Sequence, residues 1–425
     1  MAHIRLPYGR GFLDAAIPDS RIRAVLRGRL EEYVPALSAA ELTEAALEQP
    51  VGSPTLASLA AGRRRVVVIL SDHTRPVPSK LLLPPMLREI RRGNPDAEIT
   101  LLVATGCHRG TTREELTAKC GEDIVRRERI VVHDCDDTAN LVRLGTLPSG
   151  GALIVNRLAA EADLLVAEGF IEPHFFAGFS GGRKSVLPGI ASRATVLANH
   201  NAAFLADPHA RAGILDDNPI HRDMLFAARA AGLAFIANAV INARHETVAV
   251  FAGDPDAAHR RGTDFLSSLC AVSAAPAPIT VTTNNGYPLD QNLYQSVKGL
   301  SSAEPVTQDG GVILMASACT DGVGGDAFLR FFRETPDAAA LLGRIEAVPA
   351  DQTTPDQWQA QVLARILAKK KVVFLSGADP DLVRAFGMIP AADFPEALAL
   401  ADRIAGADAG INVIPEGISV IPRAV

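Results

Sequence analysis

The sequence predicts an α/β protein with largely parallel sheets. Apolar runs rich in β-branched residues occupy residues 64–70, 98–104 and 162–167, and each leads into a polar or glycine-containing loop followed by a helical pattern. Near-continuous apolar runs of this length are typical of strands buried on both faces, and their alternation with helices favours a parallel sheet. Thr112 and Glu115 have the spacing of a capping box, which marks the start of the helix after the second run.

A change of composition along the chain predicts two domains. A chain of 425 residues is long enough for two or three domains. Residues 234–252 are predicted to form two strands joined by a turn, and the segment 268–278 is rich in small residues and proline, as domain boundaries often are. A second alternation of strands and helices follows. We expect two α/β domains, residues 1–272 and 273–425, with an active-site cleft between them.

Composition excludes several classes of protein. The net charge is −6, so there is no basic excess to neutralise the phosphates of a nucleic acid. No apolar run approaches the roughly 20 residues needed to cross a bilayer, and the first residues lack the apolar core of a signal peptide. Five cysteines without a CxxC pair indicate neither a structural zinc site nor a disulfide framework. We expect a cytoplasmic protein with reduced thiols and no membrane partner.

The loop at residues 71–78, SDHTRPVP, follows the first predicted strand and carries Asp72 and Arg75. Ligands of open α/β sheets bind at the carboxyl ends of the strands, so the loops after the three runs are expected to converge. The guanidinium of Arg75 can grip a carboxylate bidentately. A solvent-exposed loop that ends at a proline explains these residues about equally well.

Three of the ten histidines occupy positions that suggest chemistry. His108 and His174 lie in loops after predicted strands, and His200 lies near the end of a predicted helix. Imidazole titrates near neutral pH and is the commonest metal ligand, so it serves in acid/base catalysis and in metal binding. A structural or surface role is the commoner explanation for any single histidine, but catalytic residues are concentrated in such loops.

The segment 178–184, GFSGGRK, is glycine-rich and basic. Glycine permits positive φ and close backbone approach, and amide groups with Arg183 and Lys184 attract anions, so phosphate or carboxylate binding is favoured over a simple turn. The segment is neither a Walker loop nor a GxGxxG fingerprint, and it gives no specific support for ATP or NAD binding.

Residues 290–298 are predicted to form an amphipathic helix. Leu293 and Val297 belong to its apolar face, whereas Gln295 and Lys298 lie on a polar face. The polar face is either solvent-exposed or one wall of the cleft.

Five segments together resemble the nickel-dependent lactate racemase family, whose members are racemases or epimerases of 2-hydroxy acids. The segments are SDHTRPVP (71–78), TGCHRGTT (105–112), EPHFFAGFSGGRKSVLPGI (172–190), ANHN (198–201) and DQNLYQSVKG (290–299). They occur in the family's order and span most of the chain. The third segment is long and specific to the family.

The resemblance implies a cofactor and the residues that hold it. The cofactor is a nickel pincer nucleotide, pyridinium-3-thioamide-5-thiocarboxylic acid mononucleotide, which binds Ni(II) through two sulfurs and a ring carbon. Lys184 matches the lysine that forms a thioamide with it, and His200 matches the remaining nickel ligand. His108 and His174 match the two acid/base groups.

Further positions are implied to surround the cofactor and the substrate. The N-terminal domain then carries the cofactor and the catalytic histidines, and the C-terminal domain closes the cleft. The glycine-rich segment lies where a mononucleotide phosphate and a reactive lysine would be needed. Cofactor binding is assigned to Asp72, Gly181, Gly182, Arg183 and Lys184, and substrate binding to Arg75, Tyr294, Gln295, Lys298 and Trp358.

The implied activity is racemisation of a short 2-hydroxy acid, with lactate favoured, by removal and return of a hydride. The implied partners are this small-molecule acid and the enzymes of cofactor biosynthesis. Three alternatives stay open: another 2-hydroxy acid such as malate, phenyllactate or a sugar acid; a zinc-dependent hydrolase that uses the same histidines; and a non-catalytic protein that binds the nucleotide.

Overall fold

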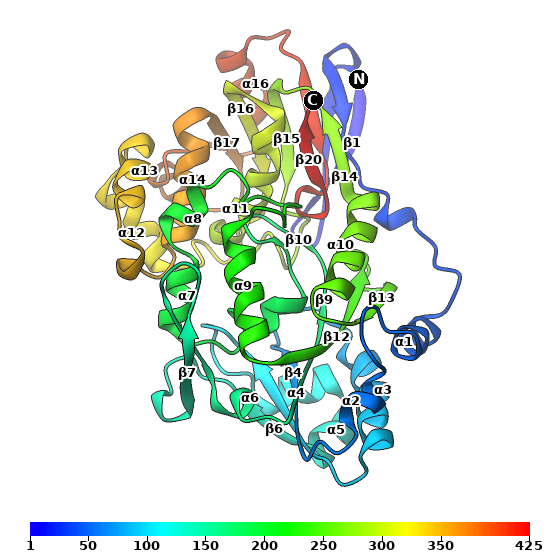
Figure 1. Cartoon of the computed structure of the whole chain (residues 1–425). Helices are drawn as coiled ribbons and strands as arrows, with labels where there is room; N and C mark the ends of the chain where they lie inside the picture. Colours follow the sequence, from blue (N-terminus) through cyan, green and yellow to red (C-terminus); the bar gives the residue numbers. More distant parts are fainter. The chain divides into compact units, whose positions relative to one another are not determined.

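The computed structural model describes residues 1–425, which divide into two compact units (Figure 1). The histidine unit comprises residues 30–200 and 209–268, and the C-terminal unit comprises residues 1–29, 201–208 and 269–425. The expected boundary between residues 272 and 273 lies close to the division at Leu269. The structure differs from the expectation in assigning the first 29 residues and residues 201–208 to the C-terminal unit.

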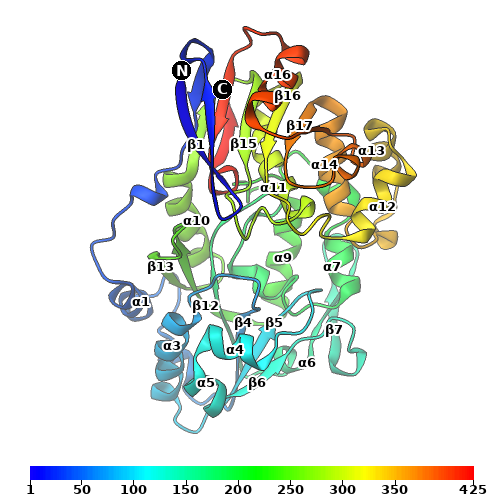
Figure 2. The same cartoon turned by 180° about the vertical axis from the view of Figure 1, so that it is seen from behind.

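The histidine unit is built on a six-stranded sheet in the order β13-β12-β9-β4-β5-β6. Every pair in it is parallel except β12 with β13, which form the predicted pair of strands joined by a turn. Figure 2 shows β4, β5 and β6 from behind. The strands are β4 (Arg65–Ser71), β5 (Glu98–Ala104), β6 (Arg129–Val132), β9 (Leu164–Phe170), β12 (Leu233–Ile241) and β13 (Thr247–Gly253).

The core of this unit explains why these segments are strands. The interior residues of β4 and β5 are buried on both faces, and all seven residues of β9 are buried. Such strands require helices on both faces of the sheet. The helices are α1 (Ala39–Glu48), α2 (Leu56–Ala60), α3 (Ser79–Gly93), α4 (Arg113–Cys120), α5 (Glu122–Arg127), α6 (Arg157–Ala160), α7 (Arg193–Asn199), α9 (Pro219–Ala230) and α10 (Ala257–Cys270), the last of which runs across the division at Leu269.

Short elements complete the histidine unit. The helix α4 begins with the predicted capping box of Thr112 and Glu115. The third apolar run extends further than predicted, because residues 168–170 continue β9 rather than beginning a loop. The short elements are the hairpins β7 (Leu141–Thr146) with β8 (Ala152–Asn156) and β10 (Pro173–His174) with β11 (Gly178–Phe179), and the 3₁₀ turns η2 (Leu30–Glu32), η3 (Thr138–Asn140) and η4 (Gly182–Ser185).

The C-terminal unit has its own six-stranded parallel sheet, in the order β18-β17-β16-β15-β19-β3. Its first strand in the chain, β3, pairs with β19 at one edge, and the hairpin of β1 and β2 packs into the same core through Ile4, Leu6, Ala15 and Ile17. These contacts are the physical reason why residues 1–29 belong to this unit. The strands are β1 (Ala2–Tyr8), β2 (Gly11–Ile17), β3 (Ile22–Val25), β14 (Ala271–Ala274), β15 (Ala277–Thr283), β16 (Thr307–Ala316), β17 (Lys371–Leu375), β18 (Ile389–Ala391), β19 (Ile411–Ile414) and β20 (Ile421–Ala424).

The predicted amphipathic helix is α11 (Leu293–Ala303), which begins at its N-cap Asn292 rather than at residue 290. Its apolar face is buried, as predicted, at Leu293 and Val297. No helix in either unit combines the length and the apolar character needed to cross a membrane. The other helices of this unit are α8 (Ala202–Ala206), α12 (Asp326–Glu334), α13 (Ala338–Glu346), α14 (Gln357–Lys369), α15 (Pro380–Ala385) and α16 (Phe394–Ala405), with 3₁₀ turns η1 (Asp19–Arg21), η5 (Glu304–Val306), η6 (Ala350–Gln352) and η7 (Gly417–Ser419).

Candidate active site

The loops that follow β9, β4 and β5 leave the same edge of the sheet, because these three strands are neighbours and parallel. Backbone hydrogen bonds join two of the loops, since the amide of Gly106 donates to the carbonyl of Gly189 over 2.9 Å. The candidate residues of the histidine unit lie in these loops and in helix α7. They form two groups, one around Asp72 and one around Phe176.

The first group pairs His108 with Asp72. Nδ1 of His108 lies 2.7 Å from Oδ2 of Asp72, and the hydroxyl of Thr74 donates to Oδ1 of the same carboxylate over 2.7 Å. Asp72 is 1% exposed, whereas the side chain of His108 is 45% exposed. A carboxylate accepts the proton of Nδ1, so Nε2 of the neutral ring carries the lone pair.

The charge of Asp72 is stabilised at its buried position. Burial raises the pKa of this carboxyl, but the hydrogen bond and charge of His108, with the hydroxyl of Thr74 and the charge of Arg75, outweigh it and hold the pKa below its usual value. The group is therefore an anion at neutral pH. A fixed anion behind an imidazole orients the ring and stabilises its protonated form.

Hydrogen bonds with Glu168 of β9 and Lys119 of α4 hold the loop that carries Asp72. The carboxyl of Glu168 on β9 accepts hydrogen bonds from the amide of Ser71 and the hydroxyl of Ser79, and Nζ of Lys119 donates to the carbonyl of Arg75 over 3.0 Å. Arg75 itself is exposed. Its guanidinium is accessible to an anion, and its backbone is held in place.

The second group gathers three predicted residues around the ring of Phe176. The ring of His174 lies 4.5 Å from it, the ring of His200 lies 5.1 Å from it, both edge to face, and Nζ of Lys184 lies 6.0 Å from its centroid. His174 is on β10, Lys184 is in the turn η4 and His200 caps helix α7. The structure thus brings these residues together from three different elements, with nitrogen donors and no thiol.

His200 is 6% exposed and its ring has a defined orientation. Nδ1 lies 3.1 Å from the carbonyl of Val196, which accepts its proton, so Nε2 carries the lone pair. Burial, with the charge of Lys184, lowers the pKa of His200 to about 3. The ring is therefore neutral at physiological pH, which is the form that binds metals.

Nδ1 of His174 accepts a hydrogen bond, whereas Nδ1 of His200 donates one. The amide of Ala177 donates to its Nδ1 over 3.2 Å, so the proton of the neutral ring is placed on Nε2. The neighbouring ring of Phe175 stacks on it at 5.1 Å. No contact in the structure joins His174 to His108, which belongs to the first group.

In the predicted anion-binding segment, the buried Arg183 stabilises the turn through hydrogen bonds, and Gly181 and Gly182 adopt the positive φ that the turn requires. Arg183 is 0% exposed, and its guanidinium donates to the carbonyls of Ala177 and Gly181 over 2.7 and 3.2 Å. Gly181 and Gly182 have φ of +80° and +52°. The arginine is thus engaged by the protein backbone, and burial lowers its pKa to about 9.

The remaining predicted residues lie in the C-terminal unit. The hydroxyl of Tyr294 hydrogen-bonds with Trp358 and with the carboxyl of Asp356, and burial raises the pKa of this phenol. Gln295 and Lys298 are half-buried residues of α11. The resemblance assigned Tyr294 and Trp358 to substrate binding, and sequence reasoning missed Asp356, which has a positive φ of 65° and directly precedes α14.

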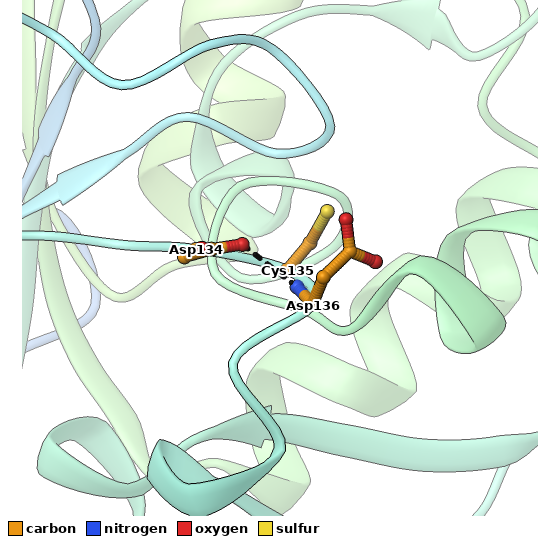
Figure 3. A group of neighbouring side chains, drawn as sticks. All are labelled: Asp134, Cys135 and Asp136. Atoms are coloured by element: carbon orange, nitrogen blue, oxygen red, sulfur yellow. Dashed lines mark hydrogen bonds between the residues drawn. The ribbon is translucent and has the colours of Figure 1, made fainter.

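One further group has the spacing of metal ligands but a different role. Ligand atoms of Asp134, Cys135 and Asp136 lie within 4.8 Å of one another (Figure 3). Both oxygens of Asp136 accept hydrogen bonds from Arg193, over 2.8 and 2.7 Å, and Oδ1 of Asp134 accepts from the amide of Asp136. The guanidinium of Arg193 therefore already pairs with one of the two carboxylates.

Sequence reasoning did not find the residues that support the lysine turn. Asn238 on β12 accepts from the amide of Gly182 over 2.7 Å, and Nε2 of His259 on α10 lies 2.8 Å from the carbonyl of Ser180. Both residues are far from the turn in sequence and lie in ordinary secondary structure. No spacing or motif in the sequence connects them with Lys184.

Fold and site together define a two-unit α/β protein with an imidazole–carboxylate pair and a lysine beside two imidazoles. The family model of the lactate racemase N-terminal domain matches residues 8–213, and that of the lactate racemase C-terminal domain matches residues 272–422. The chain belongs to the lactate racemase family.

Individual relatives agree with this assignment. The chain is 51% identical to a lactate racemase of Thermoanaerobacterium thermosaccharolyticum and 48% identical to one of Lactiplantibacillus plantarum, over 424 residues and the full length of both proteins. The lactate racemase apoprotein structure from the first organism has a TM-score of 0.96, with 51% identity, over 99% of this chain and 100% of that one. A protein of Thermotoga maritima, 20% identical with a TM-score of 0.67 over 92% of this chain and 100% of that one, shares the fold. The predicted fold class and family are confirmed.

Proposed function

We propose that this protein racemises lactate, interconverting the D and L enantiomers, with a nickel pincer nucleotide as its cofactor. Membership of the lactate racemase family and about 50% identity to two lactate racemases over the whole chain support the substrate. The grouping of Lys184, His174 and His200 around Phe176 is the observation that carries the proposal.

The chemistry of this group fits the cofactor. His200 offers a neutral imidazole whose Nδ1 proton is given to a backbone carbonyl, an arrangement that orients metal-binding histidines in general. Nickel(II) accepts imidazole together with sulfur donors, and the group contains no thiol, so the cofactor's own sulfurs would complete the set. Lys184 lies beside His200 and is the residue that would attach the cofactor covalently.

The residues of this chain have distinct roles in the proposed reaction. Arg75 binds the substrate carboxylate through its exposed guanidinium. Nε2 of His108 accepts the hydroxyl proton of one enantiomer, and the anion of Asp72 stabilises the imidazolium that results. When bound, the cofactor supplies an electron-poor centre that accepts a hydride from the substrate and returns it.

His174 completes the acid/base pair. The two enantiomers present their hydroxyl groups to opposite sides, so racemisation requires one proton-transfer group on each side of a planar keto acid. His174 acts from its imidazolium form, in which Nδ1 is protonated and no longer accepts from the amide of Ala177: its Nε2 proton passes to the keto oxygen, which restores the hydroxyl and leaves the ring neutral. For the opposite enantiomer the roles are exchanged, and Nε2 of neutral His174 accepts the hydroxyl proton.

The proposal is tested on protein produced together with the enzymes of cofactor biosynthesis, its implied partners. We expect conversion of either pure enantiomer of lactate to the racemate, nickel in the purified protein, and an added mass on the intact chain that is lost in Lys184→Ala. Absence of racemisation by nickel-loaded protein would refute the activity. An unmodified but active chain would refute the covalent attachment alone.

Two alternatives are decided by the same material. Malate, 2-hydroxybutyrate and phenyllactate tested beside lactate define the preferred acid; the match of Tyr294, Gln295, Lys298 and Trp358 to the family's positions supports a short aliphatic one. A zinc hydrolase requires several protein ligands around one metal, and no group of three His, Cys, Asp or Glu ligand atoms within 4.8 Å includes His108, His174 or His200.

A further inference from the structure

The turn that carries Lys184 rests directly on two side chains from distant segments. A Cβ at Gly181 would lie 2.7 Å from Oδ1 of Asn238, and one at Gly182 would lie 3.0 Å from the ring of His259. A side chain at Gly181 would force its neighbours to shift, one at Gly182 would press on the imidazole ring, and both positions have the positive φ that favours glycine. The turn is therefore fitted to Asn238 and His259, and its conformation depends on them.

Asn238 connects the turn with the central sheet. It is fully buried on β12, opposite Gly169 of β9, and its Oδ1 accepts the amide proton of Gly182 over 2.7 Å. Gly169 makes room for the amide, since a Cβ there would lie 2.9 Å from Nδ2. The amide of Gly182 thus has its acceptor on a strand of the central sheet.

His259 connects the turn with helix α10. It is 1% exposed, and its Nε2 lies 2.8 Å from the carbonyl of Ser180 and 3.0 Å from Nη1 of Arg183. One nitrogen either donates to the carbonyl or accepts from the guanidinium, and either arrangement ties α10 to the turn. Arg183 extends the connection to the carbonyl of Ala177, next to Phe176.

We propose that Asn238 and His259 are positioning residues for Lys184. They hold the turn so that its amine lies over the Phe176 ring and beside His200, although neither residue contacts the amine in the structure. The consequence for cofactor attachment rests on the proposed function, but the positioning of the amine does not. Loss of either support lets the turn relax and releases the amine toward solvent.

The experiment measures the reactivity of Lys184 in the protein without cofactor. The variants are His259→Leu and Asn238→Leu, with His259→Gln as the conservative variant, because the Gln amide nitrogen replaces Nε2. The matched control is His133→Leu: His133 is also a buried histidine of this unit, 2% exposed, with Nε2 3.0 Å from the carbonyl of Ala191 beyond the turn. Acylation by a succinimidyl ester is quantified by peptide mass spectrometry relative to the exposed Lys80.

We expect the acylation rate of Lys184 to rise toward that of Lys80 in both support variants, by roughly fivefold, the factor that corresponds to the net free energy of one hydrogen bond. His259→Gln should restore the wild-type rate, and His133→Leu should keep it while lowering the melting temperature. A wild-type rate in folded His259→Leu and Asn238→Leu would overturn the proposal, as would an equal rise in His133→Leu.

A second readout links positioning to the cofactor. In protein produced with cofactor biosynthesis, the fraction of chains with added mass should fall in His259→Leu and be retained in His259→Gln and His133→Leu. If the wild-type chain gains no mass, the proposed attachment fails while the acylation result still decides the positioning role. If one support variant does not fold, the other carries the test.

Discussion

Two imidazoles in the same unit, His108 and His200, are held through the same atom but are suited to different chemistry. Each has Nδ1 bonded, His108 to a carboxylate and His200 to a backbone carbonyl. His108 is 45% exposed in its side chain, and His200 is enclosed beside a lysine with its pKa lowered to about 3.

The difference shows how the surroundings select a role for an imidazole. An anionic partner stabilises the protonated ring, and solvent access allows proton exchange, so His108 is fit for proton transfer. Burial and the charge of Lys184 outweigh the hydrogen bond to the carbonyl of Val196 and disfavour the protonated ring, so His200 presents a lone pair at every physiological pH. The same side chain is therefore suited to the acid/base role proposed for His108 and to the ligand role proposed for His200.

The largest expected effect separates these two roles. His108→Ala should lower the racemisation rate by roughly 100- to 10,000-fold, the usual contribution of a positioned acid/base group, with nickel content unchanged. His200→Ala should instead lose the nickel. Chiral analysis of lactate and elemental analysis of the same samples measure both quantities.

His73 provides the control for this pair. It lies in the neighbouring loop and bonds the hydroxyl of Thr111 over 3.1 Å, and no proposed step uses it. His73→Ala should retain both turnover and nickel. Loss of nickel in His108→Ala, or its retention in His200→Ala, would contradict the division of roles.

A smaller effect is expected when the anion behind His108 is removed. Asp72→Asn keeps the shape of the side chain but removes the charge that stabilises the imidazolium, so turnover should fall by roughly tenfold to a thousandfold, part of the contribution of the acid/base group itself. The Michaelis constant for lactate should change little, whereas a fall in nickel content would reflect the implied role of Asp72 in cofactor binding. Initial rates over a range of lactate concentrations separate these effects.

Glu115→Gln is the matched variant for Asp72→Asn. This carboxylate is near the same loop, where it accepts hydrogen bonds from Arg109 and the amide of Thr112 and does not touch His108. The Glu115→Gln variant should turn over lactate at the wild-type rate. If Asp72→Asn and Glu115→Gln lose turnover equally, the rate depends on negative charge near the loop in general and not on the pairing of Asp72 with His108.

The smallest effect concerns stability and another enclosed imidazole. His221 is 4% exposed with no hydrogen-bond partner for either ring nitrogen, and burial, with the charges of Arg183, Arg260 and Arg229, lowers its pKa to about 3. As the pH falls below about 6.5, the unfolded chain binds a proton that the folded chain does not, so stability falls with pH.

His221→Leu should remove this dependence. Between about pH 8 and about pH 5, the variant should lose about 2 kcal/mol less free energy of unfolding than the wild type, because one histidine contributes about 1.4 kcal/mol per pH unit below its unfolded pKa. Urea unfolding at the two values measures the difference. If the free energy of unfolding of the two proteins falls equally between these pH values, His221 takes up its proton in the folded state.

The sequence predicted much of the fold because its signals are local. Buried runs such as residues 98–104 and the capping box at Thr112 act within a few residues, and the structure has the strand and the helix at these positions. The edge strand β3 was not predicted, because its place beside β19 depends on a pairing between residues 22–25 and 411–414.

The candidate site likewise contains residues that local segments of the sequence identify and residues that meet only in the folded chain. His108, His174, Lys184 and His200 lie in recognisable segments, whereas the support of Lys184 by Asn238 and His259 arises only when β12 and α10 pack against the turn. Arg183 illustrates the limit: its position after two glycines indicates an anion-binding group, but the structure turns its guanidinium inward onto backbone carbonyls.

The order in which the chain visits the two units has a consequence for His200. The chain passes from one unit to the other at residues 29/30, 200/201, 208/209 and 268/269. The second of these junctions follows His200 directly, so the residue proposed to hold nickel is the last residue of its unit at this point of the chain. A fragment that ended at this junction would carry a terminal carboxylate on that residue in place of a peptide bond.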